Sequence, residues 1–226
     1  MRKQVAVIGL GRFGAGLAET LTEIGYDVLA IDMDMNKVQN ISSKVTQAIQ
    51  GDATDESFLK GLDLTSMDAA VVAIGNALQS SVLSTLLLKN LGVSYLIARA
   101  ENNAHGQILN KIGADHVVYP EYQMGARLAH VLTLRHAMDY IPVSYRYGVA
   151  KINAPTELVG KTLFQSGFGR KSEKGVIVLM IQRQEEAIVS PADTEVIKDG
   201  DVLITAGQDD KLEGQFSESR RSSPRP

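Results

Sequence analysis

The sequence predicts a doubly wound, parallel α/β sheet followed by a second, smaller α+β domain. Three observations support this prediction. Short apolar runs rich in Val and Ile alternate with helical patterns as far as Pro120, which is typical of parallel strands buried on both faces. A Gly-x-Gly-x-x-Gly pattern stands between the first apolar run and the first helical pattern. From about Val143 the chain changes to short β-like runs separated by Gly, Pro and Asp.

Six apolar runs are the strand candidates of the first domain. They are QVAVIGL (4–10), DVLAID (27–32), TQAIQG (46–51), AAVVAI (69–74), YLIARA (95–100) and HVVYP (116–120). Helical spacing lies between them, at 14–25, 34–43, 77–91 and 102–112. The third of these helices is followed by Gly92, as a helix C-terminus prefers. Strands that alternate with helices in this way predict a sheet covered on both faces.

The segment after Pro120 has apolar residues at helical intervals until Pro142. These residues are Met124, Leu128, Val131, Leu132 and Met138. We interpret the segment as a last helix that leads out of the first domain.

The β-like runs beyond this helix are expected at 143–152, 175–184, 186–190 and 201–208. We therefore expect a first domain over 1–136 that includes the last helix, and a linker over 137–148. A C-terminal domain over 149–213 and a disordered, polar tail over 214–226 follow.

Composition limits the classes of function. The formal net charge is −3, and the tail holds Arg220, Arg221 and Arg225, so the body is more acidic still; this argues against a nucleic-acid surface. The sequence has no cysteine, which excludes disulfides and thiolate chemistry. No apolar run reaches the length of a membrane helix, and the N-terminal run is broken too early for a signal peptide. We expect a cytoplasmic protein.

The glycine pattern is formed by Gly9, Gly11 and Gly14, directly after the first strand and at the start of the first helix. Glycine allows a tight turn and a close approach to phosphate, and the free amides of the helix start face the anion. The loop also carries Arg12 and Phe13. The context therefore predicts a Rossmann-like nucleotide site.

Acidic residues follow the second and third strands. Asp32 ends the second strand, where its carboxylate can accept both ribose hydroxyls of a nucleotide and would repel a 2′-phosphate, so NADP is expected to bind poorly. Asp52 and Ala53 follow the third strand, where the loop would border an adenine. The alternative for both aspartates is that they only cap the helices that follow.

Two further polar residues are expected at the same edge of the sheet. Asn76 follows the fourth strand and Arg99 ends the fifth. The alternative role for Asn76 is to form a turn, and the alternative role for Arg99 is to form a structural ion pair.

No catalytic set is evident. A dehydrogenase needs a proton-transfer group and a substrate pocket beside its nicotinamide. Tyr147 and Lys151 match the Tyr-x-x-x-Lys spacing of short-chain dehydrogenases, but Gly148 and Val149 between them predict an extended chain. The histidines have no metal-ligand spacing; they are His105, His116, His130 and His136.

Several motifs together resemble one family. They are VIGLGRFG, VLAID, QGDATD, VVAIG followed by SSVLSTLLLKNLG, KIGADHVVYPE, ELVGKTL and IKDGDVLITAG, and they span about residues 3–213. The sequence is similar to the RCK (regulator of K⁺ conductance) domains that form the cytosolic regulatory subunits of Trk/Ktr potassium uptake systems, and is closest to their KtrA members.

The resemblance implies a function without catalysis. It implies an N-terminal domain that binds ATP or ADP, a helix exchanged between dimer partners, and an octameric ring under a membrane-embedded potassium-translocating subunit of the KtrB/TrkH type. The exchanged helix corresponds to EYQMGARLAHVLTLRHAM (121–138). The protein is then cytoplasmic and peripheral to the membrane through its partner.

The resemblance also implies roles for single residues. Arg12 would reach the terminal phosphate of ATP bound to the neighbouring subunit, with a solvated arginine as the alternative. Glu121 would lie at the dimer interface, where a divalent cation such as Mg²⁺ or Ca²⁺, or sodium, is associated with paired carboxylates near ATP. Asn76 would contact nucleotide. The C-terminal domain would bind cyclic di-AMP near Arg170 and KGVIVLM (174–180).

The sequence therefore predicts a regulatory subunit in which ATP and ADP favour different shapes of a ring, and so open or relax a potassium pathway. Two alternatives stay open: a redox sensor that distinguishes NADH from NAD⁺, and a small NAD-dependent oxidoreductase. The sequence leaves open the sign of the ATP effect, the number of subunits, and the ligand of the second domain.

Overall fold

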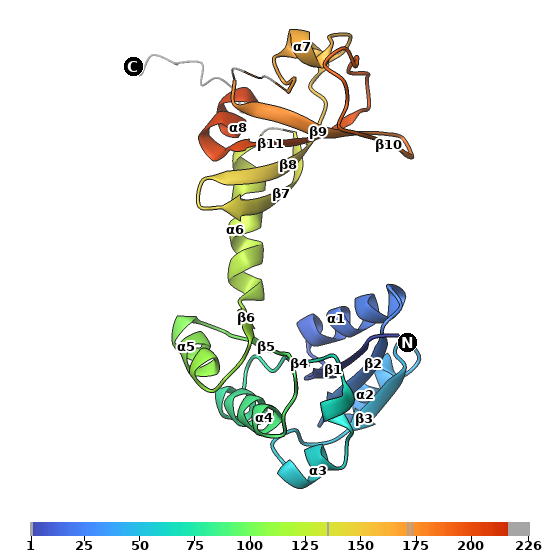
Figure 1. The fold of residues 1–226 in the computed structure, drawn as a ribbon, viewed down its shortest axis with the longest axis vertical. Coiled ribbons are helices and arrows are strands. Elements are labelled where there is room, and N and C mark those ends of the chain that lie inside the picture. The colour runs from blue at the N-terminus through green and yellow to red at the C-terminus, as the bar shows by residue number, and fades with distance from the viewer. Residues whose placement is uncertain (1, 135, 171, 173, 217–226) are drawn as a thin grey trace, which may run out of the picture. The chain divides into compact units, whose positions relative to one another are not determined.

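The structure is a computed structural model that describes residues 2–134, 136–170, 172 and 174–216. The chain forms two compact units, the first ending at Glu121 and the second beginning at Tyr122. Each unit has its own sheet and its own hydrophobic core (Figure 1).

The first unit contains a six-stranded parallel sheet in the order β3-β2-β1-β4-β5-β6. Its strands are β1 (Gln4–Ile8), β2 (Asp27–Asp32), β3 (Gln47–Gln50), β4 (Ala69–Val72), β5 (Leu96–Arg99) and β6 (His116–Val118). All six predicted strands are confirmed, and their order is that of a dinucleotide-binding fold, with the direction of winding reversing between β1 and β4.

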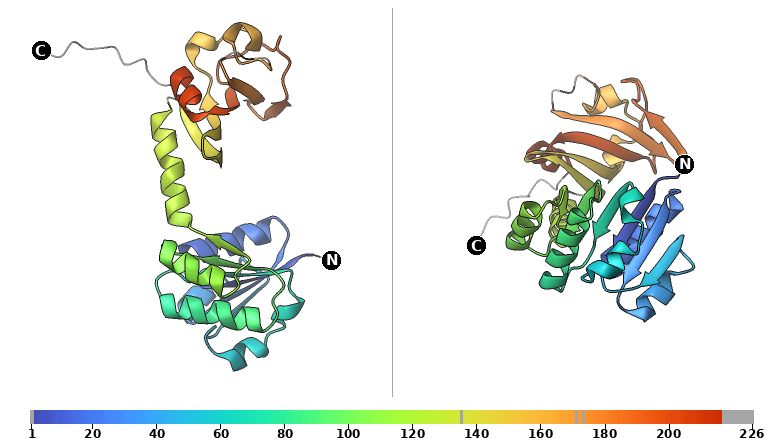
Figure 2. Two further views of the ribbon diagram at one scale, coloured as in Figure 1. Left: turned by 60° about the vertical axis from the view of Figure 1, so that its left-hand side comes forward. Right: turned by 60° about the horizontal axis from the view of Figure 1, so that its bottom comes forward.

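Helices cover both faces of this sheet (Figure 2). They are α1 (Arg12–Glu23), α2 (Met35–Ile41), α3 (Glu56–Lys60), η1 (Leu64–Ser66), α4 (Leu78–Asn90) and α5 (Asn103–Lys111). Along β1, Val5 and Val7 belong to the core under α1 and α2, whereas Ala6 and Ile8 belong to the core under α3, α4 and α5. This alternation is why the strands read as continuous apolar runs.

The second unit is built on a five-stranded antiparallel sheet in the order β10-β9-β11-β8-β7. Its strands are β7 (Ala137–Ser144), β8 (Tyr147–Asn153), β9 (Val176–Arg183), β10 (Glu186–Val189) and β11 (Val202–Gln208). The helices of this part are η2 (Thr156–Leu158), α7 (Leu163–Ser166) and α8 (Asp209–Phe216), and α6 (Pro120–Thr133) enters it from the first unit. The predicted smaller α+β domain is thus present.

The helix expected to run on to Pro142 is shorter than predicted. Helix α6 ends at Thr133, and the chain enters strand β7 at Ala137. The segment 137–148, expected to be a linker, is therefore β7 and the start of its hairpin with β8. Met138 matched the helical spacing by coincidence, since its side chain is half exposed on a strand. Pro142 is tolerated because β7 is an edge strand.

The first three residues of the expected tail are helical. Residues 214–216 are the last of helix α8, in which Leu212 and Phe216 are buried one turn apart. The Phe216 ring stacks on that of Phe168 with centroids 5.3 Å apart. The rest of the predicted tail, 217–226, lies outside the described residues.

Candidate functional site

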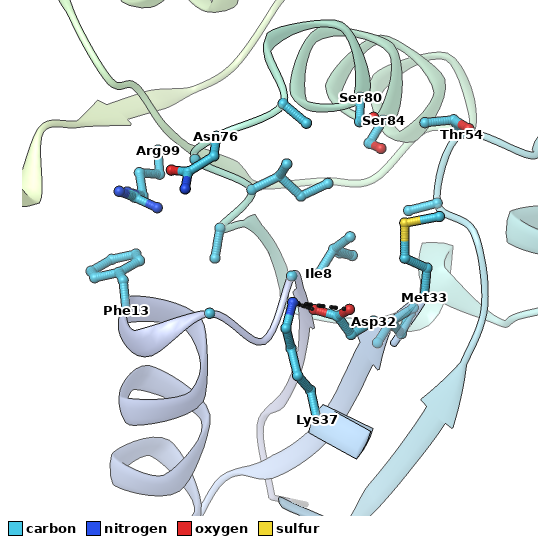
Figure 3. Close-up of a pocket in the computed structure, with 18 of the residues that line it drawn as sticks. Ile8, Phe13, Asp32, Met33, Lys37, Thr54, Asn76, Ser80, Ser84 and Arg99 are labelled. Atoms are coloured by element: carbon cyan, nitrogen blue, oxygen red, sulfur yellow. Dashed lines mark hydrogen bonds and ion pairs between the residues drawn. The ribbon is translucent and has the colours of Figure 1, made fainter. Parts of the chain in front are cut away.

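A pocket of about 480 Å³ lies at the carboxyl edge of the parallel sheet (Figure 3). The loops that follow β1, β2, β3 and β4, the first turns of α1, α2, α4 and α6, and the end of β5 supply its walls. Strands that end at one edge of a doubly wound sheet leave a crevice where the winding reverses. The pocket is therefore where the fold class places a ligand.

The glycine loop forms one wall of the pocket, and two of its glycines are required sterically. Gly9 has φ +95°, a left-handed conformation, and a side chain there would lie 3.0 Å from Ile74. A Cβ on Gly14 would lie 1.9 Å from the Gly9 carbonyl oxygen, so only glycine lets α1 pack against the loop.

The start of α1 faces the pocket without a capping side chain. Gly11 is the N-cap residue, with φ −67° and ψ −178°, and no side chain accepts from the amides that follow it. A Cβ at Gly11 would have no atom within 4 Å. Arg12 and Phe13, the first two residues of the helix, both line the pocket, and Arg12 is exposed. Uncapped amides and the helix dipole together favour an anion here.

Asp32 lies in the middle of the pocket, only 7% exposed. Its Oδ2 accepts a hydrogen bond from the Leu10 amide at 2.7 Å, and its Oδ1 accepts from the Asp34 amide at 2.9 Å. It does not cap the next helix, because the side chain of Asp34 accepts from the Asn36 amide and caps α2. The carboxylate thus ties the glycine loop to the end of β2.

Asp52 and Ala53 line the pocket at the end of β3. Asp52 Oδ1 accepts from the hydroxyl and the amide of Thr54, at 2.7 and 2.8 Å, and these hydrogen bonds hold the pKa of Asp52 below its usual value. Asp55, not Asp52, caps α3. Capping is therefore excluded as the role of either pocket aspartate.

Arg99 and Glu121 form an ion pair on the wall opposite the glycine loop. Arg99 Nη2 lies 2.5 Å from Glu121 Oε1. The structural ion pair that the sequence left open for Arg99 is thus present, and both residues also line the pocket. The buried Nε of Arg99 has no hydrogen-bond partner among the described residues. A Cβ on Gly75 would lie 2.0 Å from Arg99 Nη1, so glycine makes room for the guanidinium.

The pocket has two distinguishable ends. Figure 3 shows Arg99, Asn76 and Phe13 at one end. The other end holds Met33, Thr54, Ser80 and Ser84. Asp32 lies between the two ends.

Sequence reasoning missed several lining residues. Lys37 pairs with Asp32, and Ser84 is buried with a hydroxyl that has no partner in the described part of the chain. Lys37 could have been considered as a lining residue, because it stands on the helix that follows Asp32, but its spacing does not reveal the ion pair. Ser84 could not have been found, because its position in the sequence does not distinguish a serine that lines a pocket from a serine that packs in the core.

Other candidates lie outside the pocket. Tyr147 and Lys151 are both in strand β8, as expected from the glycine between them. His105 is buried in α5, and burial lowers its pKa. Arg170 is used within the second unit, where its Nη2 donates to Ser190 Oγ at 2.9 Å. Among the residues that the structure describes, no group of three His, Asp or Glu side chains could hold a metal ion.

Comparison with known families assigns the two parts of the chain. The model of the TrkA-N domain matches residues 5–120, and that of the TrkA-C domain matches residues 149–214. The sequence is 42% identical to Ktr system potassium uptake protein C of Bacillus subtilis, over 92% of this chain and 93% of that protein. The chain belongs to the RCK family of Trk/Ktr regulatory subunits.

A further relative agrees with this assignment, and two solved structures share the fold. Ktr system potassium uptake protein A of Bacillus subtilis is 35% identical, over 91% of each chain. The solved RCK domain of GsuK shares the fold, with a TM-score of 0.66 and 18% identity over 96% of this chain and 48% of that one. A GsuK channel has also been solved bound to NAD, with a TM-score of 0.64, 18% identity, and coverage of 94% of this chain and 38% of that one. This RCK chain thus spans about half or less of the GsuK chains.

None of the helices in the described residues is both long and apolar enough to cross a membrane.

Proposed function

We propose that this chain is a cytosolic regulatory subunit that senses adenine nucleotides and gates a membrane potassium-translocating subunit. The observation that carries the proposal is the uncapped start of α1 beside a buried carboxylate in one pocket. The amides suit phosphates, and Asp32 suits the hydroxyls of a ribose. The proposed role is binding without catalysis.

Selectivity for phosphate length is assigned to two arginines. Arg12 stands at the exposed start of α1, and Arg99 lines the same pocket with a buried Nε that has no partner in the described residues. A guanidinium binds phosphate through several directed hydrogen bonds. In this proposal Arg12 reads the terminal phosphate of ATP, in its own pocket or that of a neighbouring subunit, and Arg99 holds a phosphate nearer the sheet.

A divalent cation fits this site only with help from the ligand. Glu121 is the carboxylate at the phosphate end, and one of its oxygens is engaged by Arg99. Hard cations take six or more oxygen ligands. We propose that phosphate oxygens, and Glu121 of a second subunit, complete any Mg²⁺ or Ca²⁺ site.

Self-association is supported by helix α6. Its exposed apolar side chains are spaced one or two turns apart: Met124, Leu128 and Leu132 are 58, 55 and 79% exposed. A continuous apolar stripe on a helix marks an interaction surface. We propose that it pairs subunits in a ring, and that nucleotide-dependent changes of the ring act on the potassium pathway. A cyclic dinucleotide at the second unit, near Arg170, is a further proposal.

The alternative is a sensor of NADH and NAD⁺, which the glycine loop and Asp32 also suit. Calorimetry with ATP, ADP, NAD⁺ and NADH distinguishes the two. We expect ATP and ADP to bind, and light scattering to show a change of size or shape between them. Tight binding of NADH alone would favour the alternative, and turnover of a substrate with a nicotinamide coenzyme would contradict both.

A further inference from the structure

Lys37 joins Asp32 in the middle of the pocket. Its Nζ lies 3.2 Å from Asp32 Oδ2 and 3.4 Å from Oδ1. Its side chain is 45% exposed, whereas that of Asp32 is 7% exposed. Figure 3 shows the lysine rising from α2 toward the carboxylate. An ammonium group therefore lies against the acidic residue that, in dinucleotide-binding folds, binds the ribose hydroxyls by itself.

The pairing changes what Asp32 can do. A carboxylate offers about four acceptor positions. The amides of Leu10 and Asp34 occupy one on each oxygen, and the ammonium lies across both oxygens. Ribose hydroxyls thus compete with Lys37 for what remains. The negative charge that would repel a 2′-phosphate is also largely neutralised by its partner.

We propose that Lys37 is a specificity-determining residue, which allows the ribose subsite to accept nucleotides that carry a 2′-phosphate as well as those with a free diol. This rests on the proposed nucleotide-binding function. In dinucleotide-binding folds an acidic residue selects the diol, and a nearby cation accommodates the 2′-phosphate. Here one chain holds both groups in contact. The expectation from Asp32 alone, that NADP binds poorly, is revised accordingly.

The lysine can move from one partner to the other. It is half exposed on a flexible stem, so the ammonium can leave Asp32 for a phosphate without a shift of α2. Two other roles compete with this one. Lys37 could neutralise the phosphates common to all nucleotides, but in the proposed function Arg99 already supplies a cation for a phosphate that ATP and ADP share. It could also be a structural ion pair with no part in binding.

The test compares two ligands that differ only by the 2′-phosphate, ADP and 2′-phospho-ADP. Calorimetry on the full chain gives the dissociation constant of 2′-phospho-ADP divided by that of ADP. We expect Lys37→Met to raise this ratio about tenfold, which favours ADP, and Lys37→Arg to leave the ratio unchanged. Lys44→Met is the matched control, because Lys44 pairs with Glu19 at 2.9 Å, is similarly exposed, and lies outside the pocket.

Each remaining outcome overturns the proposal. Equal weakening of both ligands by Lys37→Met would make the lysine a ligand of the shared phosphates. An unchanged ratio with unchanged affinities would leave only a structural pair. A wild-type chain that binds ADP and excludes 2′-phospho-ADP would also refute it. A chain that binds neither nucleotide would overturn the proposed function itself, which keeps the two failures distinct.

Discussion

Arg99 Nη2 lies 2.5 Å from Glu121 Oε1, and the pair joins the end of β5 to the first turn of α6 at the pocket wall. Arg99 is largely buried, with 14% of its side chain exposed, whereas Glu121 is 64% exposed. The guanidinium is held from one side by the carboxylate, and the absence of a side chain on Gly75 leaves it room.

Gly75→Ala tests whether the position of this guanidinium matters. The new Cβ would overlap Arg99 Nη1, so the end of the side chain must move, at small cost to folding. We expect ADP and ATP affinity to fall about tenfold in calorimetry, while the melting temperature changes little. Gly16→Ala is the control, since a Cβ there meets no atom within 4 Å. Normal affinity in Gly75→Ala, with weak binding in Arg99→Ala, would show that charge alone suffices.

Arg12→Ala tests the reading of phosphate length. The side chain lies at the exposed start of α1, so its loss should not disturb the core. We expect ATP affinity to fall about tenfold and ADP affinity to be retained, because only the terminal phosphate loses a charged hydrogen bond. Competition titrations of both nucleotides measure this. If the affinities for ATP and ADP fell equally, Arg12 would only neutralise phosphate charge in general.

Placing charged residues in the exposed apolar stripe of α6 tests whether this face pairs subunits. Leu128 and Leu132 are 55 and 79% exposed. Glutamate at both positions would have to be buried in any interface that uses this face, so we expect the mass from light scattering to drop toward that of one chain. Ile24→Glu, at an exposed site outside α6, should leave the mass unchanged. An assembly that tolerates both glutamates must use another surface.

The second unit should lose stability in acid through Asp201. Burial raises the pKa of this carboxyl, but hydrogen bonds from the Arg183 side chain and the Lys198 amide outweigh burial and hold the pKa below its usual value. A depressed pKa stabilises the fold above the unfolded value of about 3.9, and this stability is lost as pH falls through the folded pKa.

Replacing Asp201 with asparagine isolates the stability that its charge contributes. Asp201→Asn leaves Arg183, whose side chain is only 20% exposed, beside a neutral group, and we expect it to destabilise the unit by about 3 kcal/mol at neutral pH in urea unfolding. The variant should also lose part of the acid dependence below pH of about 4. Asp199→Asn, at an exposed neighbouring position, is the control. Wild-type stability of the Asp201→Asn variant at neutral pH would show that Glu195 alone satisfies Arg183.

The fold of the first unit could be predicted because its evidence is local. Parallel strands buried on both faces read as apolar runs, and the glycine pattern places the anion site without reference to distant residues. Asp32, at the end of the second strand, followed from the same topology. The course of residues 134–144 could not be predicted, because Met138 fits the helical spacing while pairing with β8 decides for a strand.

The loops that gather at one edge of the sheet could be deduced from the order of apolar and helical segments, since strand order follows from alternating elements and short right-handed connections. Which charges meet there depends on how the folded elements approach one another. Arg99 pairs with Glu121 through its side-chain rotamer and the space left by Gly75. Lys37 pairs with Asp32 through its own rotamer. These pairings depend on distances of a few ångströms between separate elements, which periodicity and spacing along a chain do not encode.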